Sequence, residues 1–132
     1  MTATRLERNP IHLGLGASAI TQPTFTGDMA WYEAYGARNA NDGTEGRLVS
    51  MHTFNESWDT WEMHPLGSEV VVCTAGEITL HQELLDGSVV TVALCAGDYV
   101  INAPGVWHTA DVNAPATAVF ITAGAGTELR AR

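Results

Sequence analysis

Three potential metal ligands, Glu62, His64 and Glu69, stand close together just before and at the start of an apolar run. Side chains alternate between the two faces of an extended strand, so Glu62 and His64 point to the same side. Residues 65–68 have the composition of a turn, and a strand that returns from it can direct Glu69 at the same point. The spacing therefore predicts a site in which oxygen and nitrogen ligands meet.

A fourth potential ligand, His108, lies far along the chain, shortly after a Pro-Gly turn at residues 104–105. From that turn it can approach the first three from another strand. Two imidazoles and two carboxylates suit a divalent Fe, Mn, Ni or Zn ion, and the ligand types alone do not distinguish these metals. The predicted metal ligands are Glu62, His64, Glu69 and His108.

The position of Glu69 at the start of the run EVVVC favours a bound cation. Burying an unpaired carboxylate is costly, and a metal ion beside it removes that cost. Taken singly, His64 or His108 could equally be a hydrogen-bonded core residue, and Glu62 a solvated residue at a rim. The combination of all four favours a metal site over unrelated polar residues.

The elements that must position these ligands are short β-type runs, which begin at about residue 46. Runs such as 47–54, 69–75 and 116–122 are rich in β-branched and aromatic residues, and turn residues separate them. Asp86-Gly87, between two such runs, is the clearest hairpin signal. About seven or eight such strands are typical of a sandwich or a small barrel, and closure removes exposed strand edges. The sequence thus predicts an all-β chain with a single jelly-roll barrel.

The first 45 residues differ from the rest, because they mix aromatic residues with Gly, Asn and Thr. Only residues 30–38 read as a short helix. Large apolar side chains such as Trp31 and Tyr32 should not remain in water. We expect an extended N-terminal arm at 1–45 that packs on the barrel or on a partner subunit, a barrel at 46–126 and a C-terminal tail at 127–132. The aromatic arm also favours a homodimer.

Composition and charge exclude several classes of partner. The chain has 132 residues, of which 45% are hydrophobic, and this suits one packed domain. Its formal charge is −9, with 15 acidic against 6 basic residues, so it should repel a nucleic-acid backbone. No stretch approaches the roughly 20 apolar residues of a membrane span, and Glu7 interrupts the basic region that a signal peptide requires. We expect a cytoplasmic protein that binds neither nucleic acid nor membranes.

The spacing of both ligand clusters resembles the two sequence motifs of the cupin family, over residues 46–124. The matching positions are His64, Glu69 and Gly76 in the first motif and Gly97, Gly105 and His108 in the second. The positions that depart from the motifs are Ser57, Glu62, Ala103 and Val112. Glu62 stands where the family has its first histidine, so the family's shell of three histidines and one glutamate is not intact.

The resemblance implies a jelly-roll barrel of six to eight strands with a metal inside its wider mouth. It also implies a dimeric habit, and it admits dioxygenation, isomerisation or epimerisation, and lyase chemistry. We expect an enzyme that acts on a small organic, oxygen-rich or sugar-like molecule. In it the metal polarises substrate oxygens, and Glu62 or His52 moves protons.

Two alternatives remain open at this point. The same cavity could hold a ligand without turnover, as in a small-molecule sensor or binding protein. Glu62 could also turn away, so that no metal binds and the barrel is purely structural. The tryptophans near the ligands could hold a planar or sugar-like molecule, although packing is the favoured role; they are Trp58, Trp61 and Trp107. His12 and His81 are expected to be structural or exposed.

Overall fold

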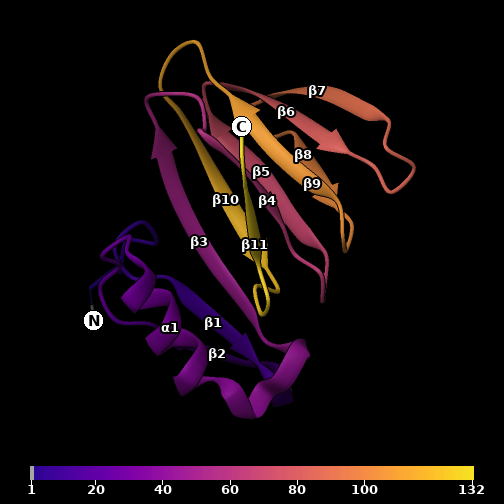
Figure 1. Ribbon diagram of the computed structural model, residues 1–132. Coiled ribbons are helices and arrows are strands. Elements are labelled where there is room, and N and C mark those ends of the chain that lie inside the picture. Colours follow the sequence, from indigo (N-terminus) through magenta and orange to yellow (C-terminus); the bar gives the residue numbers. More distant parts are fainter. Residues whose placement is uncertain (1) are drawn as a thin grey trace.

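The computed structural model describes residues 2–132, which form two antiparallel β-sheets (Figure 1). The first sheet has six strands, in the order β2 (Ser18–Thr21), β1 (Ile11–Gly14), β3 (Arg47–Phe54), β10 (Ala116–Thr122), β5 (Glu69–Ala75) and β8 (Tyr99–Asn102). The second has five, in the order β11 (Glu128–Ala131), β4 (Thr60–Met63), β9 (Trp107–Asp111), β6 (Glu77–Glu83) and β7 (Val89–Cys95). Within residues 2–132, no helix is both long and apolar enough to cross a membrane.

The core lies between the two sheets, because each strand buries alternate side chains. In β5, for example, Val71 and Cys73 are buried while Val72 between them is only partly covered. They pack with Ile78 and Leu80 of β6 and with Phe120 of β10. Burial therefore alternates with a period of two along the strand, although the apolar run in the sequence is continuous.

The first 45 residues contain regular structure. Strand β1 pairs with both β2 and β3, so it extends the six-stranded sheet. Helix α1 (Met29–Arg38) follows, and Asp28 begins it by accepting a hydrogen bond of 3.0 Å from the backbone N–H of Trp31. Two 3-10 helices, η1 (Leu15–Ala17) and η2 (Ala40–Glu45), complete this part. The boundaries at residues 46 and 127 stay predictions, and β11, within the expected tail, pairs with β4.

Buried His12 joins three elements of the N-terminal part. Its Nδ1 atom lies 2.6 Å from the Tyr35 hydroxyl in α1, and its Nε2 atom lies 2.6 Å from Asp42 in η2. Burial raises the pKa of Tyr35 to about 12, so this hydroxyl stays protonated at neutral pH. Tyr35 can therefore donate to His12, which in turn donates to Asp42, and the chain of bonds holds α1 against β1.

Gly76, which matches the end of the first cupin motif, makes the tight turn between β5 and β6. Its φ is +73°, and an added Cβ would lie 2.6 Å from the carbonyl oxygen of Pro115. We expect Gly76→Ala to lower the free energy of unfolding by about 3 kcal/mol, from backbone strain and overpacking together. Gly87→Ala is the control, because its φ is +85° but a Cβ meets nothing within 4 Å. It should cost about 1 kcal/mol, and equal losses in urea unfolding would contradict the prediction.

Candidate metal centre

Three strands, two from one sheet and one from the other, bring the four predicted ligands together. Glu62 lies in β4 and His64 just beyond it, Glu69 begins β5, and His108 lies in β9. The register pairs Glu62 directly with His108. Ligand atoms of Glu62, His64 and His108 all lie within 4.8 Å of one another. The predicted convergence of these side chains therefore occurs in the fold.

Glu69 completes the cluster from the facing sheet. Its Oε2 atom lies 3.1 Å from His64 Nε2, and its Oε1 atom lies 3.1 Å from His108 Nε2. Two ligands that are each about 2.1 Å from one ion are separated by roughly 3.0 to 3.4 Å. The spacing of the Glu69 oxygens and the two imidazoles is thus the spacing of ligands around a common centre.

The four side chains differ in their burial. His64, Glu69 and His108 are 6%, 4% and 0% exposed, whereas Glu62 is 34% exposed. The nearest contact of Glu62 is also longer, at 3.9 Å from its Oε2 atom to His108 Nε2. Three of the residues therefore form a buried core of the centre, and Glu62 stands on its open side.

Thr127 fixes the tautomer of neutral His64. The Thr127 hydroxyl donates its one proton to the carbonyl oxygen of Gly124, at 2.7 Å. It can therefore only accept from His64 Nδ1, which lies 2.8 Å away. His64 must carry its proton on Nδ1, and its Nε2 lone pair is directed at the centre of the cluster.

A backbone carbonyl imposes the same tautomer on His108. Its Nδ1 atom lies 3.3 Å from the oxygen of Val106, and a carbonyl oxygen only accepts hydrogen bonds. Neutral His108 therefore also presents a bare Nε2 lone pair. A protein that holds the outer nitrogen of each imidazole in this way orients the inner nitrogen as a metal ligand.

The bare nitrogens show that a cation fits this site. Neither Nε2 atom of His64 and His108 has a hydrogen-bond partner, although both are buried and close to Glu69. Two imidazole lone pairs facing a carboxylate are unfavourable unless positive charge lies between them, and a buried unpaired polar atom is costly. A divalent ion would satisfy both nitrogens and the Glu69 charge at once.

Glu69 is held in place from behind by neutral groups. Asn102 donates to its Oε1 atom at 3.2 Å, and Thr122 donates to its Oε2 atom at 2.6 Å. Gln82 in turn donates to the Asn102 side-chain oxygen at 2.8 Å, which orients the Asn102 amide. The carboxylate thus has one fixed orientation, with its remaining lone pairs directed toward the imidazoles.

The surroundings move the pKa values of the acidic and basic groups apart. Burial would raise the pKa of Glu69, but the contacts with His108 and His64 lower it, so this carboxylate stays ionised. Burial alone would lower the pKa of His108, but its contact with Glu69 raises it. Burial and the neighbouring Glu69 charge raise the pKa of Glu62. The two carboxylates therefore differ in character, and Glu62 is the one more easily protonated.

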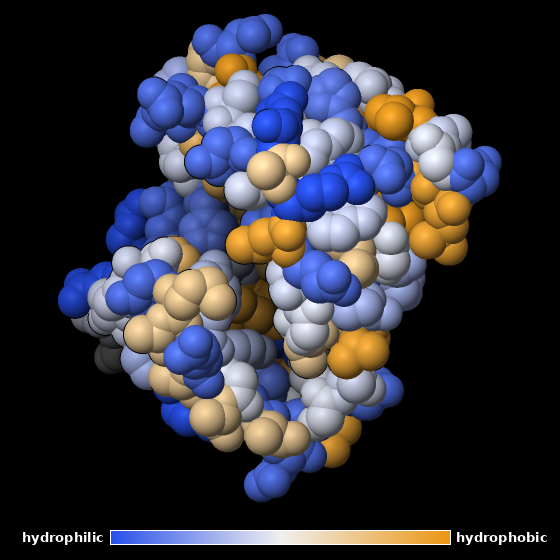
Figure 2. Space-filling model, viewed as in Figure 1, coloured by the Kyte–Doolittle hydropathy of each residue, from blue (hydrophilic) through white to orange (hydrophobic). Residues whose placement is uncertain are grey.

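A cavity of about 1330 Å³ opens beside the cluster and is lined by both the barrel and the N-terminal part. Figure 2 shows the surface hollowed between α1 and the barrel, with hydrophobic residues visible in its depth. Glu62, His64 and Glu69 line this cavity, and so does the second predicted catalytic residue, His52 in β3. The candidate metal centre is therefore open to a small molecule from this side.

His52 lies away from the four ligands, in an aromatic part of the cavity. Its ring centroid is 5.0 Å from that of Phe25 and 5.8 Å from that of Phe120. Burial lowers the pKa of His52, so the imidazole is neutral at pH 7. The structure places it where it can meet a ligand of the cavity, and its role in proton transfer stays a prediction.

Sequence reasoning missed the residues that orient the ligands. Thr122, Asn102 and Thr127 contact Glu69 or His64 across 53, 33 and 63 residues of chain. No local pattern marks such pairs. Asn102 carried one weak signal, since a polar side chain that ends the apolar run YVIN needs a partner when buried.

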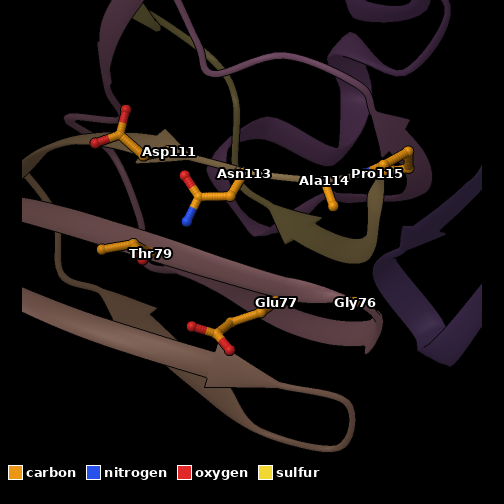
Figure 3. A pocket seen from close by; sticks show the side chains of 7 residues that line it. All are labelled: Gly76, Glu77, Thr79, Asp111, Asn113, Ala114 and Pro115. Atoms are coloured by element: carbon orange, nitrogen blue, oxygen red, sulfur yellow. The ribbon is translucent and has the colours of Figure 1, made fainter.

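A second, smaller pocket of about 270 Å³ lies at the turn that contains Gly76 (Figure 3). Its polar lining residues Asp111 and Asn113 stand opposite Thr79 and Glu77. None of the four predicted ligands lines it. The Asp111 carboxylate already accepts a hydrogen bond of 2.7 Å from His81 and pairs with Arg132. None of the residues that line this pocket has a buried polar atom without a hydrogen-bond partner.

Replacing Thr127 by valine is expected to weaken metal binding about 10-fold to 100-fold, because His64 loses the group that fixes its tautomer and orientation. Thr127 is exposed, so the fold should be unaffected. Thr127→Ser keeps the hydroxyl and is the matched control. Competition of each variant with a chromophoric zinc chelator measures the affinity, and an unchanged affinity in the valine variant would show that Thr127 does not position His64.

Comparison with known proteins supports the fold and leaves the activity open. The sequence matches no protein-family model and no curated protein. An oxalate oxidase in complex with the substrate analogue glycolate shares the fold, with a TM-score of 0.57 and 19% identity over 70% of this chain and 50% of that one. The chain thus spans half the length of that enzyme. Identity this low is evidence of a common fold alone.

Two further solved structures align less well. A cupin-2 domain protein from Shewanella frigidimarina has a TM-score of 0.48 and 17% identity, over 58% of this chain and 69% of that one. Hydroquinone 1,2-dioxygenase from Sphingomonas sp. TTNP3 has a TM-score of 0.48 and 15% identity, over 58% and 59% of the two chains. The prediction of an all-β jelly roll is confirmed by the two antiparallel sheets and by the fold shared with oxalate oxidase.

Proposed function

We propose that this chain is a metal-dependent enzyme of the cupin type that acts on a small organic molecule. The observation that carries the proposal is the pair of buried Nε2 atoms of His64 and His108, both without partners and both beside the Glu69 carboxylate. The proposed ligands are Glu62, His64, Glu69 and His108. Bound there, a divalent ion would polarise substrate oxygens as a Lewis acid or take part in dioxygenation, isomerisation or lyase chemistry.

The residues of the chain supply positioning and proton transfer in this proposal. His64, Glu69 and His108 are held rigidly and do not leave the centre. Glu62 stands on the cavity side, and its raised pKa suits a group that accepts and returns a proton beside the substrate. Neutral His52 is available as a second base at the aromatic wall.

The second candidate function is a binding protein or sensor that holds the same molecule without turnover. It would use the same cavity and metal but would not need Glu62 or His52 to move protons. A homodimer and a cytoplasmic location, with no nucleic-acid or membrane partner, remain predictions from the sequence. Light scattering tests the dimer.

Metal content is the first test of the proposal. Protein purified without added metal, or loaded with a stoichiometric amount of Fe, Mn, Ni or Zn and then desalted, should retain about one equivalent of metal by elemental analysis. Less than about a tenth of an equivalent under all conditions would contradict the metal centre.

Turnover separates the enzyme from the binding protein. Metal-loaded protein would be screened against diketones, catechols and acidic sugars, with oxygen uptake and product formation as the readouts. Product formation that disappears in Glu62→Gln, but not in the distant control His81→Ala, would support an enzyme. Tight binding of a ligand with no turnover in any class would favour the sensor.

A further inference from the structure

We propose that the molecule bound beside the metal centre is an uncharged compound with an aromatic ring and two neighbouring oxygen donors, such as a catechol or an aryl 1,3-diketone. Acidic sugars and dicarboxylates are excluded by the same proposal. It rests on the proposed function, because the oxygen pair is taken to bind the metal. The evidence lies in the aromatic rings and the charges that line the cavity.

The inner wall of the cavity, next to the metal ligands, is aromatic. The Trp58 ring lies 6.2 Å from the ring of His108, so it borders the metal centre directly. Phe54 and Phe120 continue this wall, with centroids 5.5 Å and 6.1 Å from that of Trp58. All three rings line the cavity. Ring faces and edges at these separations offer offset and edge-to-face contacts to another ring.

The outer wall comes from the N-terminal part of the chain. Phe25 lies 5.0 Å from His52 and 5.7 Å from Tyr32 of α1, measured between ring centroids, and all three line the cavity. The aromatic surface therefore continues from the metal centre to the opening seen in Figure 2. Along this wall the polar side-chain atoms are confined to the indole N–H of Trp58, the His52 imidazole and the Tyr32 hydroxyl, and the rest of each ring offers a sugar hydroxyl no hydrogen bond.

The charges on the lining exclude anions. Five carboxylates line the cavity: Glu33, Glu56, Asp59, Glu62 and Glu69. The chain has six basic residues, all arginines, and none of them lines it. Two ionised carboxylate ligands would leave a divalent ion with little net positive charge to attract an anion. A carboxylate elsewhere on the substrate would lose its water with no basic side chain to pair with.

The cavity has room for a ring-containing ligand. Its volume of about 1330 Å³ is larger than the roughly 300 to 1,000 Å³ that is common for organic ligands of drug-like size. A ring with a substituent can therefore reach from the metal to the Phe25 end of the wall. A small diacid would leave the aromatic side chains exposed to water.

The first test compares two diketones that differ in a ring. Zinc-loaded protein, chosen because zinc has no redox chemistry, is titrated calorimetrically with 1-phenylbutane-1,3-dione and with pentane-2,4-dione. We expect the phenyl compound to bind at least about tenfold more tightly. Equal affinities, or a preference for the smaller diketone, would overturn the aromatic part of the proposal.

The second test compares two catechols that differ in a charge. Under anaerobic conditions, catechol should bind the zinc-loaded protein about tenfold more tightly than 3,4-dihydroxybenzoate, which adds one carboxylate to the same ring and oxygen pair. Glucuronate and oxalate should bind more weakly still. Equal or tighter binding of any of these anions would overturn the charge part.

Variants of the wall show whether the ring binds where it is placed. Trp58→Ala and Phe25→Ala should each reduce the ratio of the two affinities, phenyl diketone over pentane-2,4-dione, toward one. Phe25 lies outside the core between the sheets, so its variant should fold even if the Trp58 variant does not. An undiminished preference in the folded variants would contradict this placement.

The zinc content and the ligand preferences test the metal centre and the substrate class separately. Failure to retain one equivalent of zinc would refute the metal centre and with it the proposed function. Retention of zinc without the expected ligand preferences would refute the substrate class alone.

Discussion

Replacing both His64 and His108 by alanine is expected to abolish stoichiometric metal binding and leave the fold intact. The two imidazoles supply the only buried imidazole nitrogens without a hydrogen-bond partner within residues 2–132, and both lie beside Glu69. Neither residue belongs to the hydrophobic core between the sheets, so the barrel should survive their loss. Elemental analysis after desalting measures the effect directly.

Thermal unfolding provides a second readout of the same variant. A metal that binds only the folded state should raise the unfolding temperature of the wild type on the order of 10 °C when its concentration is about 1,000 times its dissociation constant. The double variant should show no such shift. His81→Ala is the matched control, because His81 contacts Thr91 and Asp111 on the less buried face of its strand. Stoichiometric metal in the double variant would show that the site has been placed wrongly.

The two carboxylates of the centre are expected to contribute unequally. Glu69→Gln should weaken metal binding by about 100-fold or more, because Glu69 is buried between both imidazoles and an amide nitrogen would face the donors of Asn102 or Thr122. Glu62→Gln should cost about tenfold or less, since Glu62 is partly exposed and water can replace it. A chelator competition assay measures both affinities.

Glu56→Gln is the control for this comparison, because Glu56 lines the same cavity but is not among the proposed ligands. Its metal affinity should equal that of the wild type. If Glu62→Gln proves as damaging as Glu69→Gln, then Glu62 is an equal ligand and a poor candidate for a proton carrier. If Glu69→Gln has no effect, the Glu69 carboxylate only orients the imidazoles.

Much of the fold could be predicted from the sequence because β-structure leaves local signals. The β-type runs at 69–75 and 116–122 correspond to β5 and β10, and Asp86-Gly87 lies between β6 and β7, which pair as a hairpin. The strands of the N-terminal part are harder to predict from the sequence. The short runs at 11–14 and 18–21 become strands by pairing with each other and with β3, a contact that no local pattern encodes.

The sequence by itself determined which side chains are available to the centre and that they share a face. Alternation along a strand places Glu62 and His64 on one side, and a turn brings Glu69 back beside them. Only the tertiary structure decided how they are used. Thr127 and Asn102 orient His64 and Glu69 from distant positions, and α1 turns an open barrel end into a cavity. The physical reason is that hydrogen-bond direction and burial depend on packing between segments far apart in the chain, whereas residue type and strand period are local.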